Sequence, residues 1–85
     1  MIYHVVVEMP LAFVLVNVEA GTDKEVLANL KKVPEVRSAY MVYGVYDIIV
    51  MIESDTLERL REMVTKKVRQ LDKVRSTMTM IVMES

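Results

Sequence analysis

The chain contains 85 residues, 53% of them hydrophobic, and carries a formal net charge of −1. A chain of this length has room for one hydrophobic core, and its apolar composition with little net charge excludes an intrinsically disordered protein. So small a globule cannot bury that much hydrophobic material inside itself. We therefore expect part of the apolar surface to be covered by a partner.

Cysteine is absent, and the apolar runs are all far shorter than the roughly 20 residues that a membrane-spanning helix needs. The composition excludes a disulfide framework and a thiolate metal site. It predicts a cytoplasmic protein that does not enter a membrane.

Most of the basic residues follow residue 58, and one interpretation of this asymmetry is a nucleic-acid-binding surface. Glu58 and Glu62 are interleaved with them, however, which is typical of the solvent-exposed face of an amphipathic helix. A phosphate-binding surface needs a clustered basic stripe. We therefore expect no direct DNA binding. The basic residues concerned are Arg59, Arg61, Lys66, Lys67 and Arg69.

The N-terminal segment Ile2–Met9 is apolar, and Pro10 separates it from a strand expected at Leu11–Val18. We predict an N-terminal arm strand over residues 1–10 that pairs with another subunit, followed by a folded domain over residues 11–85. The strand at Leu11–Val18 is apolar at odd and even positions alike, so it is expected to be central and covered on both faces.

A helix is predicted next, because the segment Thr22–Glu25 matches a capping box in which the Thr hydroxyl and the Glu carboxylate accept the first amides. Pro34 ends this helix, since the residue before a proline is excluded from the α region. Apolar residues at helical spacing form its expected buried stripe: Val26, Leu27, Leu30 and Val33.

A hairpin of two strands, Val36–Tyr43 and Tyr46–Glu53, is predicted around Gly44. Ser54 and Asp55 are candidate caps for a second, long helix. The last expected strand covers residues 74–83. The apolar stripe of the second helix consists of Leu57, Leu60, Val64, Val68 and Leu71.

The resulting order is strand, helix, strand, strand, helix, strand, and the tripeptide Val-Arg-Ser opens the strand after each helix, at Val36 and at Val74. Two βαβ halves predict an α+β protein with a ferredoxin-like βαββαβ plait. Right-handed crossovers place both helices on one face of a four-stranded antiparallel sheet. The other face is left apolar, and we expect a second copy of the chain to cover it.

The chain offers few groups for catalysis. His4 is the only histidine, and Gly21 and Gly44 are the only glycines, which excludes a glycine-rich phosphate loop. Metal sites and catalytic triads need a second donor beside His4. We expect no catalytic residue, no metal and no cofactor, and the methionines on strands are interpreted as core or dimer contacts.

The segment Tyr43–Asp47 is the most informative for function. One interpretation is purely structural, with Gly44 adopting a positive φ and Asp47 accepting hydrogen bonds from turn amides. The other is a ligand pocket, in which the rings of Tyr40, Tyr43 and Tyr46 are partly exposed around the turn.

A resemblance favours the pocket. Gly44 and Asp47 form a Gly-x-x-Asp element, and Thr77 and Thr79 form a Thr-x-Thr element near the start of the last strand. Together with the order of the predicted elements, these motifs resemble the effector-binding (RAM) domain of the Lrp/AsnC transcriptional regulators over about residues 11–84. Such regulators carry a helix-turn-helix domain ahead of this module, where this chain has Ile2–Met9. The resemblance thus implies a stand-alone effector-binding module.

The resemblance also implies an amino-acid site between neighbouring dimers. An amino acid needs donors for its carboxylate and an acceptor for its ammonium group. The amides around Gly44 and the hydroxyls of the Thr-x-Thr element would bind the carboxylate, Asp47 the ammonium, and the tyrosines would flank the side chain. Arg75 is expected on the same strand face as the two threonines. The predicted ligand-binding residues are Tyr43, Gly44, Tyr46, Asp47, Arg75, Thr77 and Thr79.

The leading hypothesis is a non-catalytic amino-acid-binding module that forms dimers and larger rings, with the ligand tuning assembly or contact with a full-length regulator. A second hypothesis is a structural adaptor that pairs with such regulators and binds no metabolite. A third is a small dimeric α+β barrel enzyme, although its interior would then need polar groups where the strands carry Val, Ile, Met and Phe.

Overall fold

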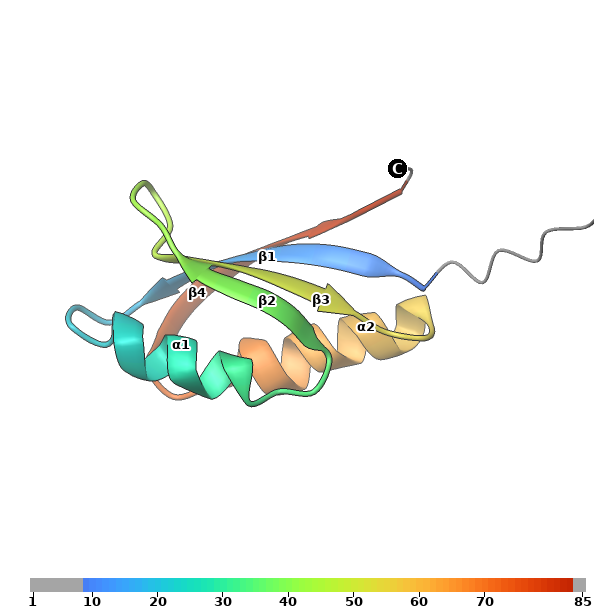
Figure 1. Ribbon diagram of the computed structural model, residues 1–85, viewed down its shortest axis with the longest axis horizontal. Helices are drawn as coiled ribbons and strands as arrows, with labels where there is room; N and C mark the ends of the chain where they lie inside the picture. Colours follow the sequence, from blue (N-terminus) through green and yellow to red (C-terminus); the bar gives the residue numbers. More distant parts are fainter. Residues whose placement is uncertain (1–8, 84–85) are drawn as a thin grey trace, which may run out of the picture.

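The computed structural model describes residues 9–83 and contains one four-stranded antiparallel sheet with the strand order β2-β3-β1-β4. Both helices lie against one face of this sheet (Figure 1). The predicted ferredoxin-like plait is confirmed. The predicted arm over residues 1–10 lies outside the described residues, apart from Met9 and Pro10. The elements are β1 (Leu11–Val18), α1 (Asp23–Lys31), β2 (Val36–Met41), β3 (Ile48–Glu53), α2 (Leu57–Met63), a π-helical segment η1 (Val64–Val68) and β4 (Val74–Ile81).

Strand β1 is central, with β3 on one side and β4 on the other. Its side chains alternate between fully buried and half-buried positions, because the helices cover only one face of the sheet. The core on the helix side includes Val14, Val16, Val50 and Ile52, all of which are inaccessible to solvent. The expectation that β1 is apolar on both faces therefore holds, but within one chain only one face is covered.

Helix α1 begins after Thr22, but its capping box is not formed. The Thr22 side chain makes no hydrogen bond to the first helical amides. Its hydroxyl instead donates to the Glu19 carbonyl oxygen at 2.7 Å, which closes the preceding turn. The helix ends at Lys31, three residues before Pro34, and buries Val26 as predicted.

Helix α2 is capped by Thr56, whose hydroxyl accepts the Arg59 amide at 3.1 Å. Ser54 and Asp55 are thus not the capping residues. Thr56 is the N-cap because its backbone is extended and it immediately precedes the first helical residue, Leu57. Leu57 is 41% exposed, so its predicted place in the buried stripe is wrong.

The continuation of α2 is a π-helical turn, in which the Arg69 amide donates to the Val64 carbonyl oxygen at 2.9 Å. The sequence predicts a single regular helix here. Val64 and Val68 are nevertheless both buried as expected. The wider turn affects where the neighbouring side chains of Thr65 and Arg69 lie.

The two hairpin strands are shorter than predicted. They pair only as far as Met41 and Ile48, and the Val42 amide donates to the Asp47 carbonyl oxygen to close the loop. Aromatic and β-branched residues made this loop resemble strand, but Tyr43 and Val45 are exposed and have no core to pack against. The last strand ends at Ile81, and Val82 adds one further bond to the Leu11 carbonyl oxygen.

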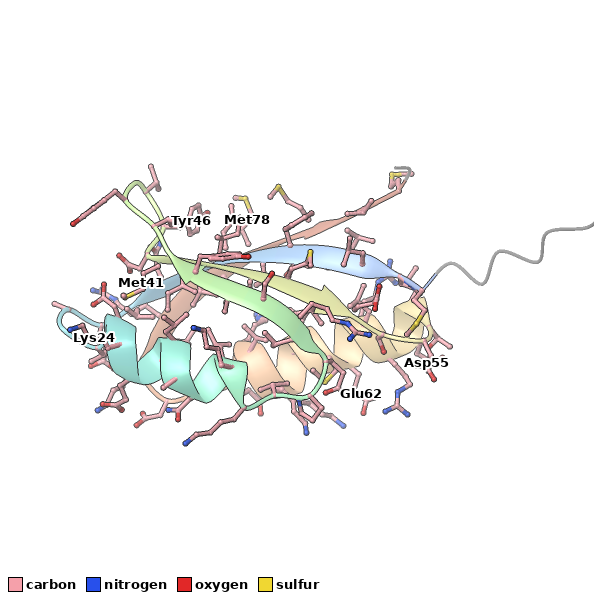
Figure 2. All side chains as sticks on the ribbon, viewed as in Figure 1. Lys24, Met41, Tyr46, Asp55, Glu62 and Met78 are labelled. Carbon is pink, nitrogen blue, oxygen red and sulfur yellow. The ribbon has the colours of Figure 1, made fainter. Side chains whose placement is uncertain are left out.

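The face of the sheet opposite the helices is uncovered and apolar (Figure 2). Edge strand β4 contributes Met78 and Met80, which are 49% and 46% exposed, and β2 contributes Tyr40 at 59%. We call this surface the uncovered face. Its half-buried central residues are Phe13, Leu15, Ile49 and Met51. The predicted covering of this face by a second copy stays a prediction.

Candidate functional site

The loop between β2 and β3 rises above the sheet, away from the helix layer (Figure 1). Gly44 lies in this loop with a φ of +152°, as the sequence predicts, and an added Cβ would meet no atom within 4 Å. Glycine is therefore required here by the backbone conformation and not by crowding. Tyr43 is fully exposed beside it, so within one chain its ring flanks nothing.

Tyr46 points across the uncovered face. Its hydroxyl donates to the Met78 sulfur at 3.7 Å, which links the loop to β4 over the intervening β1. Figure 2 shows the two side chains close together above the sheet. The loop is thus anchored on the uncovered face, on the side of the sheet where no helix lies.

Asp47 is bound to the end of β1. Its backbone amide donates to the Val16 carbonyl oxygen at 3.0 Å, and its Oδ2 accepts the Val18 amide at 2.9 Å. The carboxylate therefore continues the β1–β3 ladder by one bond. The acceptor role that the sequence predicts for Asp47 is therefore directed at a strand amide and not at the amides of its own turn. Among residues 9–83, Oδ1 has no hydrogen-bond partner.

Asp47 and Arg75 line one hollow of 360 Å³ at this end of the sheet, together with Asn17, Val18 and Ser76. Val74 and Ser76 pair with Val18 and Asn17 of β1, but Arg75 between them has no partner residue, because β4 forms a bulge there. The bulge interrupts the strict alternation behind the predicted common face of Arg75 and the threonines, but Arg75 and Thr77 still line one hollow. The hollow brings an acidic and a basic predicted site residue together.

Thr77 and Thr79 lie on the opposite side of the sheet from Tyr46. They pair with the buried Val16 and Val14, so they face the helix layer. Because β4 is an edge strand, they stay partly exposed and line a groove beside α2 and η1. Within one chain, the predicted residue Tyr46 therefore lies on the opposite side of the sheet from Thr77 and Thr79.

Sequence reasoning missed three residues of this groove, namely Arg61, Thr65 and Arg69. They are spaced four apart, which is a signal for one helix face. The sequence interpretation places Arg61 and Arg69 on a solvent-exposed face with the other basic residues and assigns no role to Thr65. Within residues 9–83, no group of three or more His, Asp or Glu side chains is placed to hold a metal ion.

None of the helices in the described part of the chain is long and apolar enough to cross a membrane.

The sheet order, the two helices on one face and the Gly44–Asp47 loop define a ferredoxin-like α+β domain with its polar residues gathered at one loop and one edge strand. Residues 11–85 match the family model described as the Lrp/AsnC ligand binding domain. The chain belongs to this family, so the predicted family is confirmed.

A curated relative is the HTH-type transcriptional regulator FL11 of Pyrococcus horikoshii. It is 39% identical over 75 residues, which cover 88% of this chain and 49% of the relative. The chain thus spans about half the length of the curated relatives it matches.

Two solved structures are similar over most of their own length. The crystal structure of FFRP-DM1 is 44% identical with a TM-score of 0.84, and the match covers 87% of this chain and 99% of that one. The structure of hypothetical protein PHS023 from Pyrococcus horikoshii is 43% identical with a TM-score of 0.84, covering 91% and 93%. Both support the fold described above.

Proposed function

We propose that the chain is a non-catalytic effector-binding module of an Lrp/AsnC-type regulatory system, and that its effector is an amino acid. The observation that carries this proposal is the match of residues 11–85 to the Lrp/AsnC ligand binding domain. Curated relatives are transcriptional regulators, and no enzyme stands among those named above. Because such regulators act on DNA, we place the module with them in the cytoplasm.

The amino acid would be bound between subunits. Asp47 Oδ1 is available for the ammonium group, while Oδ2 remains on the Val18 amide. The carboxylate would take the amides around Gly44 and the hydroxyls of Thr77 and Thr79 from a neighbouring copy, since one chain holds these groups on opposite sides of its sheet. Tyr43 is exposed and free to cover the ligand side chain.

The uncovered face would hold two copies together. Its exposed methionines and tyrosine lie beside half-buried aliphatic residues, which is a surface that a soluble monomer rarely leaves in water. Dimers would then associate into larger rings through the loop and β4, and occupancy of the sites would shift that equilibrium. The module would influence transcription through contact with a full-length regulator and not by binding DNA itself.

The test combines a thermal-shift screen of the twenty amino acids with native mass spectrometry. We expect at least one amino acid to raise the melting temperature and to change the distribution between dimers and larger assemblies. Stabilisation by none of them, together with mixed complexes with a full-length regulator, would favour the adaptor hypothesis instead. Turnover of a bound compound would contradict the assignment as a non-catalytic module.

A further inference from the structure

Three neighbouring hollows lie along β4, and the first of them is on the side of the strand that faces the helices. This first hollow has a volume of 540 Å³, within the usual range for small-molecule sites, and lies between α2, η1 and β4. Arg69 and Thr77 also line a second hollow of 290 Å³, which in turn shares Arg75 and Ser76 with the hollow at Asp47. The shared lining residues join the three hollows into one surface, which we call the β4 groove.

Three arginines line the β4 groove, namely Arg61, Arg69 and Arg75. Within the described part of the chain, none of the three has a carboxylate at ion-pair distance. Two other basic residues of this segment are paired, since Arg59 contacts Asp55 at 3.4 Å and Lys66 contacts Glu62 at 3.2 Å. Both of them line a different hollow together with Lys67, so the groove arginines are set apart by their position and by having no ion pair within residues 9–83.

The π-helical turn keeps Arg61, Thr65 and Arg69 on one side of the helix. In an α-helix, residues four apart drift by about 40° around the axis at each step, because a turn holds 3.6 residues. The turn closed by Arg69 and Val64 holds more residues and counteracts that drift. Arg61, Thr65 and Arg69 consequently all line the groove, while Val64 and Val68 stay buried beneath them.

The side chains that line the β4 groove are mainly hydrogen-bond donors. Its donors are guanidinium groups and the hydroxyls of Thr65, Thr77 and Thr79, and the one acidic residue in the linked hollows is Asp47 at the far end. Guanidinium groups bind carboxylate and phosphate oxygens in pairs of parallel hydrogen bonds. A neutral or basic side chain would leave these donors without an acceptor.

We propose that the β4 groove binds a small dianion, and that the effector of this module therefore carries a second acidic group besides its carboxylate. Arg61 and Arg69 would bind the additional group, next to the carboxylate held by Thr77 and Thr79. Dicarboxylic amino acids, other dicarboxylates and phosphorylated metabolites share this chemistry. The inference rests on the proposed function in assuming a small-molecule effector, and it adds the charge class of that effector.

Calorimetry with L-glutamate, L-aspartate, succinate, inorganic phosphate, L-leucine and L-lysine tests the inference on the full chain. We expect an acidic probe to bind, with an affinity that falls as ionic strength rises. Arg69→Gln and Arg61→Gln should each weaken that binding by about 10- to 100-fold, because a charge-assisted bond is lost. Arg59→Gln is the matched control, since Arg59 lies on the same helix outside the groove, and it should change the affinity by at most about twofold.

The probes separate the possible sources. Binding of succinate or phosphate that depends on Arg69 supports a site for anions without an ammonium group, and binding of glutamate or aspartate alone supports one that also engages Asp47. A neutral or basic amino acid that binds equally well to wild type and Arg69→Gln overturns the inference and leaves the proposed function standing. Absence of binding by all twenty amino acids and by the anions overturns both.

Discussion

Asp47 serves the fold directly, whatever it does for a ligand. Its Oδ2 accepts the amide of the buried Val18, one residue before β3 begins at Ile48. Its Oδ1 is left free within residues 9–83. Truncation of Asp47 would therefore remove a structural bond together with any contact to an ammonium group, and only an isosteric change separates the two.

We expect Asp47→Asn to keep the fold and to lose amino-acid affinity. The amide oxygen of Asn still accepts the Val18 amide, but the negative charge is gone. Loss of a charge-assisted bond to ammonium should weaken binding by about 30- to 1000-fold, which is about 2–4 kcal/mol. Calorimetry with the amino acid found in the screen measures the affinity, and urea denaturation measures the fold.

The control variant is Asp47→Ala, which should in addition destabilise the protein by about 1–3 kcal/mol, because the Val18 amide loses its acceptor. Equal affinity of wild type and Asp47→Asn would remove Asp47 from the ligand site and leave it with a purely structural role.

Lys73, just before β4, has a positive φ of 73° although it is not a glycine. Its ammonium lies 3.0 Å from Glu25 Oε2, and the hydrogen bond to Glu25, followed by the charge of that carboxylate, raises the pKa of Lys73. A raised lysine pKa means that this contact stabilises the fold below the ordinary lysine pKa. The contribution is lost as pH rises through the raised value.

Lys73→Gly should unfold at a higher urea concentration than Lys73→Ala at neutral pH. Both variants remove the contact with Glu25, but only glycine adopts a positive φ without steric cost. Denaturation curves of the two variants provide the comparison. Identical midpoints would show that the backbone of Lys73 is not strained.

At the scale of elements, the start of α2 depends on Thr56. Its hydroxyl accepts one of the amides that an α-helix leaves unpaired in its first turn. Asp55, one residue earlier, instead pairs with Arg59 at 3.4 Å, and both of these side chains are more than half exposed. The two neighbouring polar residues thus support the helix through contacts of different strength.

Thr56→Ala is expected to lower the free energy of unfolding by about 1 kcal/mol, as is usual for removal of an N-cap hydroxyl. Asp55→Ala, the neighbouring control, should cost about 0.5 kcal/mol or less, because exposed ion pairs are screened by solvent. Chemical denaturation of both variants measures the difference. A larger effect at Asp55 would return the capping role to the residue that the sequence favours.

At the scale of the whole molecule, the helices cover one face of the sheet and leave the other apolar. Met80 lies on the uncovered face and Leu57 at the start of the helix layer, and their exposed fractions in the isolated chain are 46% and 41%. In a monomer the two positions would therefore respond alike to a charged substitution. In a dimer formed through the uncovered face, only Met80 would be buried.

We expect Met80→Glu to shift the protein from dimer to monomer at micromolar concentration, and Leu57→Glu to remain dimeric. A carboxylate on the uncovered face would have to be desolvated when two sheets pack together, which carries a large cost for an unpaired charge. Sedimentation velocity of the wild type and both variants measures the masses. A monomeric wild type, or dissociation of Leu57→Glu alone, would exclude the uncovered face as the dimer interface.

Features that depend on local chemistry and on periodicity could be predicted from the sequence. The apolar runs predict the four strands of the sheet, and the helical spacing predicts that Val26, Leu30, Leu60 and Val68 are buried. The glycine at position 44 predicts the positive φ of the loop. These inferences succeed because each depends on residues close together in the chain, where backbone sterics and side-chain spacing act directly. The motifs around Gly44 and Thr77 also led to the family.

The contacts of the polar side chains could not be predicted from the sequence, because they depend on how the elements pack. The partner of Asp47 is the Val18 amide, 29 residues away, and the placement of Tyr46 and the two threonines on opposite sides of the sheet follows from the strand pairing. The groove lined by Arg61 and Arg69 likewise depends on a wide helical turn lying beside an edge strand. Such contacts are set by how distant segments pack, and no local pattern in the sequence encodes that packing.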